Sequence, residues 1–129
     1  MSLLHRLFRR HESRGARGER LAASYLRTRG FRILERNLHV HDDEADLVAL
    51  DPDGTTVVLV EVKTRSNDGI APEASVNQRK RQHLVRMAMK LQQQPSYRDR
   101  PFRFDVVAVV MPENGDAIVR HIPAAFVAQ

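Results

Sequence analysis

The sequence contains no cysteine and no tryptophan, and aromatic residues make up only 5% of it. The lack of cysteine excludes disulfides, thiolate zinc sites and cysteine nucleophiles, and it is typical of proteins of the reducing cytosol. No apolar run approaches the roughly 20 residues that a membrane-spanning helix needs. Motifs typical of esterases, P-loop enzymes and dinucleotide-binding enzymes are also missing. These absences predict a cytoplasmic protein that does not interact with membranes and uses none of those chemistries.

The length of 129 residues fits one compact domain, and no internal repeat, low-complexity tract or linker divides the sequence. Its start, Met1 to His11, carries three arginines around only four apolar residues. A secretory signal peptide needs a longer apolar stretch after its charges. We therefore interpret residues 1–12 as a basic N-terminal arm and residues 13–129 as a single domain.

Charge is distributed in blocks along the chain. The net charge of +5 favours polyanions over acidic substrates, without identifying a ligand. Residues 1–36 contain ten arginines and three glutamates, whereas residues 37–61 contain seven acidic residues and no lysine or arginine. A solvated acidic loop is the simpler interpretation of this second block. Because basic residues flank it on both sides, a cation site set within a phosphate-binding surface is the alternative.

Hydrophobic periodicity predicts an α/β domain with a mixed sheet, in the order helix, three strands, helix, two strands. Leu21 and Tyr25 recur at helical spacing, and Gly30 is placed to end that helix. The run at 57–62 is apolar on both faces, as in a central strand covered on each side. A turn-forming sequence at 51–54 joins this strand to the one before it. The expected helices cover residues 13–29 and about 76–93, and the expected strands cover 31–37, 46–50, 56–64, 102–110 and 117–122.

Charged side chains gather on two of the expected strands. If the turn pairs Leu50 with Thr55, Glu44 lies opposite Glu61, and Asp46 lies opposite the residue two positions before Glu61. Since side chains alternate along a strand, one face then carries four charged residues. These four residues are Glu44, Asp46, Glu61 and Lys63.

A charged quartet on otherwise apolar strands is costly to bury without a partner. A divalent cation would neutralise the carboxylates, and Mg²⁺ favours sparse carboxylate ligands plus waters and phosphate oxygens. Lys63 can then hold or deprotonate the attacking water and stabilise charge on the phosphate. An isolated Glu-Val-Lys is usually an exposed ion pair, but here Asp46 lies one hairpin earlier and no basic residue nearby would pair with it.

Several short motifs together resemble the YraN-like family of small bacterial proteins. The similarity extends from about Arg14 to Phe126, and the motifs occur in the family's order, so that together they are specific although each alone is weak. This chain departs from the family's pattern in two places. Asp46 ends a Glu-Ala-Asp motif where the pattern has Pro-Asp, and Asp43 replaces the glycine that usually precedes Glu44. Neither departure removes a ligand. The motifs are Gly18-Glu19, Arg36-Asn37, Glu44-Ala45-Asp46-Leu47, Val60-Glu61-Val62-Lys63-Thr64-Arg65, Lys80 and Arg103-Phe104-Asp105-Val106-Val107.

That family resembles the restriction-endonuclease-like PD-(D/E)xK superfamily, and most of all the archaeal Holliday-junction resolvases. The resemblance implies a Mg²⁺ or Mn²⁺ site formed by Asp46, Glu61 and the carbonyl of Val62. It also implies that Lys63 is the catalytic lysine and that Glu19, on the first helix, faces the same site as a further catalytic residue.

Four further residues are candidates for contact with nucleic acid: Arg65, Gln78, Lys80 and Arg17. Arg65 either clamps a phosphate or pairs with Glu44 or Glu61. The start of the second helix, at 78–81, either binds a phosphate with its amides and basic side chains or is simply solvated. We favour phosphate contact for Lys80, which matches the family, and solvation for Arg81.

Two other polar features are interpreted as structural. Asp105 lies in an apolar strand, where an ion pair with Arg103 or Arg36 is favoured over a role as a second acid. His39 and His41 would share a face if extended and could bind a transition metal, but such a pair is more typical of an exposed loop.

The sequence therefore predicts metal-dependent hydrolysis of phosphodiester bonds in DNA, with branched structures as candidate substrates. Few aromatic residues are present to stack on bases, so contacts would run mostly to phosphates. The alternative hypothesis is a nucleic-acid-binding or adaptor domain that kept the fold without turnover. Nothing in the sequence excludes RNA as the substrate. A homodimer is expected from the resemblance to resolvases, which address two strands symmetrically.

Overall fold

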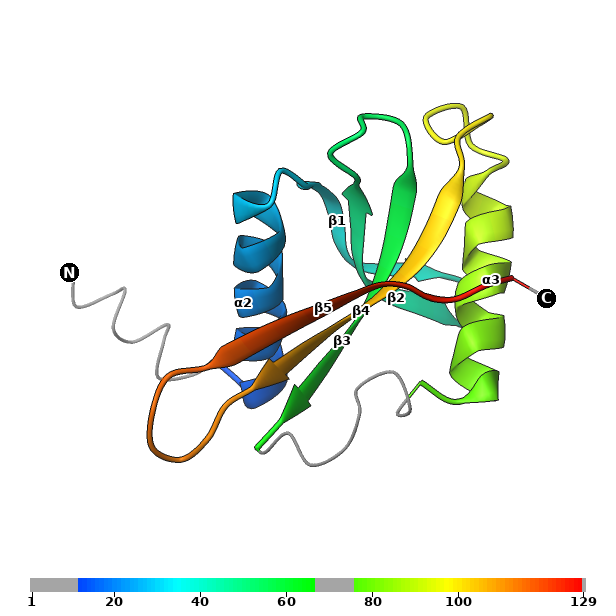
Figure 1. Cartoon of the computed structure of the whole chain (residues 1–129). Coiled ribbons are helices and arrows are strands. Elements are labelled where there is room, and N and C mark those ends of the chain that lie inside the picture. The colour runs from blue at the N-terminus through cyan, green and yellow to red at the C-terminus, as the bar shows by residue number, and fades with distance from the viewer. Residues whose placement is uncertain (1–11, 67–75, 129) are drawn as a thin grey trace.

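The computed structural model describes residues 12–66 and 76–128, so the arm expected over residues 1–12 lies almost entirely outside the described residues. Within these ranges a five-stranded sheet, with the strand order β1-β2-β3-β4-β5, is flanked by two helices (Figure 1). The expected α/β class and the expected order of elements are confirmed. No helix in these ranges is both long and apolar enough to cross a membrane. The elements are α2 (Arg14–Thr28), β1 (Arg32–Val40), β2 (Asp43–Leu50), β3 (Val57–Arg65), α3 (Gln78–Leu91), β4 (Phe102–Val110) and β5 (Ile118–Phe126).

Both helices begin at a side-chain cap. The hydroxyl of Ser13 accepts a hydrogen bond from the amide of Ala16, and the amide oxygen of Asn77 accepts one from the amide of Lys80. The second cap explains why α3 begins at Gln78 and not at the expected 76. At the end of α2, Gly30 has a φ of +91°, a conformation that a residue with a side chain rarely adopts, and the helix ends there as predicted.

The sheet has a separate apolar core on each face. Val57 and Leu59 of β3 pack with α3, whereas Val58 and Val60 pack with α2. All four are fully buried, as the apolar run at 57–62 predicted for a central strand. β3 pairs with β4 in parallel through the α3 crossover, and the other pairings are antiparallel, so the sheet is mixed.

The expected register of the β2–β3 hairpin is wrong by two residues. Leu50 pairs with Val57, not with Thr55, because the connection runs through Thr56. The carboxylate of Asp53 closes this longer turn by accepting hydrogen bonds from the amides of Thr55 and Thr56. Glu44 therefore does not lie opposite Glu61; it pairs with His39 on β1.

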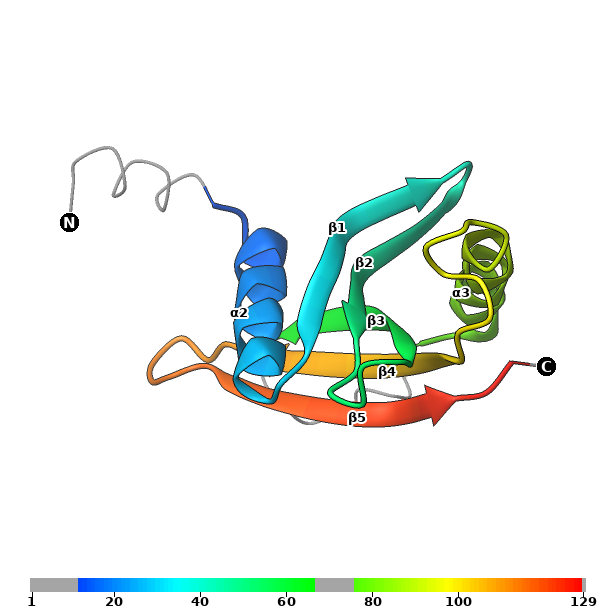
Figure 2. The same cartoon turned by 90° about the horizontal axis from the view of Figure 1, so that it is seen from above.

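β2 leaves β3 at Asp46. The last described pair between these strands is Leu47 with Val60. Although Ala45 and Leu47 are two residues apart, Ala45 packs in the core under α3 and Leu47 in the core under α2, so the alternation of side chains breaks between them. Figure 2 shows the β1–β2 hairpin bending away from the other strands toward α3 at this point. The quartet expected on one flat face is therefore wrong for Glu44.

Three strands extend well beyond their expected limits. β1 continues to Val40, past the expected end at Asn37. β2 begins at Asp43, three residues before the expected start, because the bent hairpin continues to pair with β1. β5 continues to Phe126, past the expected end at Ile122. Pro123 and Ala124 form a bulge there, and Ala124 has a φ of +49°. A proline inside a strand is usually a sign that the strand has ended, which is why the sequence prediction stopped early.

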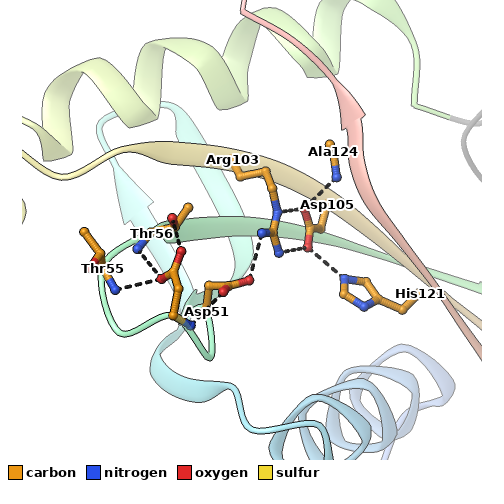
Figure 3. A network of polar contacts seen from close by, with 8 residues as sticks. Asp51, Thr55, Thr56, Arg103, Asp105, His121 and Ala124 are labelled. Carbon is orange, nitrogen blue, oxygen red and sulfur yellow. Dashed lines mark hydrogen bonds and ion pairs between the residues drawn. The ribbon is translucent and has the colours of Figure 1, made fainter.

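Asp105 forms an ion-pair network on the α2 face of the sheet (Figure 3). Both of its carboxylate oxygens bind the guanidinium of Arg103, at 2.8 and 2.9 Å, and His121 lies 2.7 Å away. Asp105 also accepts a hydrogen bond from the amide of Ala124, so it satisfies the donor that the β5 bulge frees. Arg103 in turn reaches Asp51 in the β2–β3 turn. The predicted ion pair with Arg103 is confirmed, and it is structural.

Candidate active site

The candidate site lies where β2 and β3 separate. The carboxylate of Asp46 accepts a hydrogen bond from the amide of Val62 at 2.8 Å. This side-chain bond forms just beyond the last backbone pairing of the two strands. Because the N–H and C=O of one strand residue point to the same neighbouring side, the Val62 carbonyl is directed toward the same gap as Asp46. The bend in β2 thus leaves a gap in the backbone pairing of the two strands, bordered by a carboxylate and a backbone carbonyl.

Glu61 lies beside this gap and is 6% exposed. Its oxygen Oε1 is 3.5 Å from Lys63 Nζ, and its oxygen Oε2 is 3.5 Å from Lys80 Nζ. The contact with Lys80 is an ion pair without hydrogen-bond geometry, so buried Oε2 accepts no hydrogen bond from the described residues. Buried carboxylate oxygens are rarely left in this state, and each such case requires an explanation.

The charged state of both carboxylates is disfavoured. Burial raises the pKa of Asp46, an effect that the hydrogen bond from Val62 only partly offsets. Burial also raises the pKa of Glu61, and the negative charge of Asp46 raises it further, against the opposing charges of Lys80 and Lys63. Raised carboxyl pKa values beside one another are typical of functional sites, although structural pairs show them too.

Glu19 faces the same site from α2. Burial raises its pKa, and the charges of Asp46 and Glu44 add to the effect, while a hydrogen bond from the side chain of Asn37 opposes it. The helix comes this close to β3 because of Gly18: a Cβ at this position would overlap the hydroxyl of Thr64. The structure therefore brings Asp46, Glu61 and Lys63 together, and it places Glu19 within electrostatic reach of Asp46. The catalytic roles of these four residues stay a prediction.

The donors fit a hard divalent cation. Among residues 12–66 and 76–128, no three His, Cys, Asp or Glu side chains are placed to hold a metal ion. What the gap offers is the carboxylate of Asp46, the unsatisfied oxygen of Glu61 and the carbonyl of Val62. Mg²⁺ takes one or two carboxylates and keeps several waters, whereas Zn²⁺ and Cu²⁺ prefer sites with nitrogen or sulfur ligands. An oxygen-only set of this size matches Mg²⁺ or Mn²⁺.

The residues predicted to contact nucleic acid lie in different places. Lys80 joins the site, through Glu61. Arg65 donates to the carbonyl of Thr64, and within the described part of the chain it forms no ion pair with either carboxylate suggested for it. Arg17 lines a hollow near the start of α2. Gln78 lines a groove on the other side of α3, against Phe126, away from the gap.

Several expected structural roles can also be placed. Arg81 donates to the carbonyl of Val76 and lies over the ring of Phe126, so it is a structural residue and not a purely solvated one. His39 and His41 are both exposed, as expected. His41 lies at the hairpin turn with a φ of +55°, but His39 lies within β1, 3.9 Å from Glu44, and not in the expected loop.

Sequence reasoning missed Asp43, which is 2% exposed. Three basic side chains of α3 bind its carboxylate at 3.0 to 3.1 Å. Although burial raises its pKa, the hydrogen bonds from Lys90 and Arg86 outweigh that effect and lower it. Asp43 thereby fastens the bent hairpin to α3. In the sequence it is one of three consecutive acidic residues, which is typical of a solvated turn, and the spacing of His83, Arg86 and Lys90 along one helix face was the available signal.

Comparison with known proteins supports the resemblance on which these roles depend. A family model described as "Uncharacterised protein family UPF0102" matches residues 18–109. The chain belongs to the UPF0102 family. A UPF0102 protein of Geotalea uraniireducens is 38% identical over 117 residues, which are 90% of this chain and 91% of the relative. A UPF0102 protein of Corynebacterium efficiens is 44% identical over 108 residues, or 83% of this chain and 86% of the relative. The expected membership of the YraN-like family is confirmed.

Solved structures with some likeness to this UPF0102 chain are more distant. A repair endonuclease from Pyrococcus abyssi has a TM-score of 0.43 and 19% identity, and the match covers 72% of this chain and 35% of that protein. SfsA from Pyrococcus furiosus, solved with Ca²⁺, has a TM-score of 0.40 and 14% identity, over 84% of this chain and 61% of that protein. Likenesses at these scores support no argument about the activity of this chain.

Proposed function

We propose that this UPF0102 protein is a metal-dependent endonuclease that hydrolyses phosphodiester bonds in DNA, with branched structures as its substrates. The observation that carries the proposal is the unsatisfied oxygen of Glu61, buried beside Asp46 at the point where β2 and β3 separate. A buried carboxylate pair with raised pKa values weakens the fold unless a cation binds to it. The family resemblance supports the same residues.

Asp46, Glu61 and the carbonyl of Val62 would hold Mg²⁺ or Mn²⁺. Such an ion supplies an activated water and neutralises charge on the scissile phosphate. Lys63, whose side chain is 21% exposed and contacts Oε1 of Glu61, is placed to hold the attacking water and to stabilise negative charge on the phosphate. Glu19 borders the same space from α2, where it can accept or deliver a proton.

Contacts with DNA would run mainly to phosphates. Arg17 and Arg65 lie near the junction of α2 and the end of β3, and Lys80 lies on the opposite side of Glu61. Such contacts select shape and charge more than base sequence. A homodimer would let two sites address two strands of a junction.

One observation favours a second candidate function, a nucleic-acid-binding or adaptor domain without turnover. Lys63 and Lys80 already place two positive charges at Glu61. If these lysines neutralise the carboxylate permanently, the basic surface binds nucleic acid and the site never takes a metal ion.

Cleavage and binding measured in parallel separate the two functions. Purified protein is incubated with labelled four-way junction, flap, single-stranded and duplex DNA, and with matched RNA junctions, in Mg²⁺ or Mn²⁺. We expect junction-selective cutting that Asp46→Ala and Lys63→Ala abolish while binding persists. Salt-sensitive binding with no cutting in either metal would reject the endonuclease and favour the adaptor. Preferential cutting of the RNA junction would reassign the substrate.

A further inference from the structure

The ammonium of Lys80 lies between a backbone carbonyl oxygen and a carboxylate oxygen. It donates to the carbonyl of Glu44 at 3.2 Å, and it lies 3.5 Å from Oε2 of Glu61. Only the first contact is a hydrogen bond, since Oε2 accepts none. The lysine therefore neutralises Oε2 mainly through its charge, at a separation on the limit of a hydrogen bond, and it makes its shorter bond to the Glu44 carbonyl.

The backbone position of Lys80 is fixed by contacts at both ends of α3. Its amide donates a hydrogen bond to the side-chain oxygen of the cap residue Asn77 at 2.9 Å. One turn further and beyond, His83, Arg86 and Lys90 fasten α3 to Asp43 of the hairpin that also carries Asp46. The helix cap and the ion pairs with Asp43 thus both fix the position of α3, and the ammonium of Lys80 lies beside Oε2 of Glu61 as a result.

We propose that Lys80 is a placeholder for the metal ion: it neutralises Oε2 of Glu61 in the metal-free protein, and it leaves that oxygen when a divalent cation binds there. This inference rests on the proposed function, because it assumes that Glu61 is a metal ligand. It assigns Lys80 a role at the metal-free site in addition to the phosphate contact proposed above.

Two cations cannot share this oxygen. At separations near 4 Å, like charges in a partly buried site repel one another strongly. The side chain of Lys80 has room to move away from Glu61. It is 28% exposed, and it lines an open hollow of about 350 Å³ with Asn77 and Arg79. The Glu44 carbonyl, which lines the same hollow, can keep the ammonium close to the site after it leaves Glu61.

Lys63 does not compete in the same way. It contacts the other carboxylate oxygen, Oε1, from the same strand as Glu61. A cation on Oε2 leaves that contact intact. The two lysines thus have separate tasks, with Lys63 retained beside the loaded site and Lys80 displaced from it.

The first test measures Mn²⁺ binding by calorimetry in the absence of nucleic acid. Lys80→Met is compared with wild type and with Arg79→Met, which removes one positive charge from the same hollow without a contact to Glu61. We expect Lys80→Met to bind Mn²⁺ about tenfold more tightly than wild type. Arg79→Met should stay within about twofold of wild type, because an exposed charge is largely screened at physiological salt. Lys80→Gln should behave like Lys80→Met.

The second test needs no metal. In excess chelator, Lys80→Met should lower the melting temperature, and it should have little effect when Glu61→Gln is already present, because a neutral side chain needs no placeholder. Equal Mn²⁺ affinities for Lys80→Met and Arg79→Met would overturn the inference while the endonuclease proposal stands. If wild type binds no Mn²⁺, the inference and the metal-dependent part of the proposed function both fail. A melting temperature that falls equally with and without Glu61→Gln would also overturn the inference.

Discussion

Asp46 on β2 and Val62 on β3 are joined by a hydrogen bond of 2.8 Å from the amide of Val62 to the Asp46 carboxylate. The bond forms where the backbone pairing of the two strands has ended. It holds the site open because it fixes the distance between the strands without closing the gap with further ladder bonds. The same carboxylate is therefore both a structural acceptor and a candidate metal ligand.

These two roles of Asp46 can be separated by substitution. Asp46→Asn keeps an oxygen that can accept the bond from Val62, and it removes the charge that burial disfavours. We expect this variant to unfold at an equal or higher denaturant concentration than wild type, with a gain of up to about 1 kcal/mol, and to lose DNA cleavage. Urea unfolding without metal measures the first effect. A clear loss of stability would show that the charge is structural.

Asp105 offers a matched control within the sheet, in the network with Arg103 and His121. It is fully buried; although burial raises its pKa, the hydrogen bonds from Arg103 and His121 outweigh that effect and lower it. Asp105→Asn should destabilise the protein by about 3–5 kcal/mol, because it leaves the guanidinium of Arg103 without its bidentate partner. Urea unfolding compares the two variants directly. Similar effects of Asp46→Asn and Asp105→Asn would contradict the distinction between a functional and a structural aspartate.

The raised pKa of Glu61 predicts a dependence of stability on pH. A carboxyl whose pKa is higher in the folded protein than in the unfolded chain stabilises the fold only below its unfolded value, near 4.3, and this contribution is lost as the pH rises through the folded value. Glu61→Gln should therefore be more stable than wild type near pH 7, and the difference should shrink toward about pH 4.

Thermal unfolding of both proteins across this pH range, in chelator, tests the prediction. Asp43 and Asp105 have lowered pKa values, so the stability that they contribute is lost in acid from wild type and Glu61→Gln alike. Only the difference in stability between the two proteins is therefore informative. Saturating Mn²⁺ should remove or reverse the difference at neutral pH, because it stabilises only the protein with the ligand. A difference that grows on acidification has the wrong sign for this account.

The close approach of α2 to β3 depends on the absence of a side chain at Gly18. Gly18→Ala should destabilise the protein by about 1–3 kcal/mol, because the added methyl group meets the hydroxyl of Thr64. Gly15→Ala in the same helix meets nothing within 4 Å and should stabilise it by about 0.5–1 kcal/mol. Thermal unfolding of the two variants measures both signs. Adding Thr64→Ala should recover part of the stability lost in Gly18→Ala, and no recovery would place the strain elsewhere.

The sequence predicted the order of elements because their periodicity and turn signals are local. The apolar run of β3 and the glycine that ends α2 each determine the backbone structure of only the few residues around them. The site residues on β3 were found because Glu61 follows four apolar residues, at 57–60, that are fully buried. What could not be predicted depends on distant parts of the chain. The start of β2 looks like a solvated acidic turn, and only α3, about forty residues later, provides the side chains that bury and bind Asp43.

The register error has a similar cause. The sequence at 51–54 is a complete turn by itself, but the carboxylate of Asp53 also binds the amides of Thr55 and Thr56 and lengthens the connection by two residues. An even shift preserves which side chains of the two strands share a face, and for that reason Asp46 still comes close to Glu61. The bend of β2 at Asp46 removes Glu44 from the pairing with β3, and no local signal predicts that bend.

The most direct test of the metal site uses the absence of cysteine from the sequence. Asp46→Cys introduces the single thiol of the protein at the proposed ligand position, where sulfur binds Mg²⁺ poorly and the softer Cd²⁺ well. Cleavage of a four-way DNA junction is then measured for wild type and variant in each metal. The account predicts that the variant loses cleavage in Mg²⁺ and regains it when Cd²⁺ is added. Full cleavage by the variant in Mg²⁺, or no recovery in Cd²⁺ while wild type remains active, would contradict the assignment of Asp46 as a metal ligand.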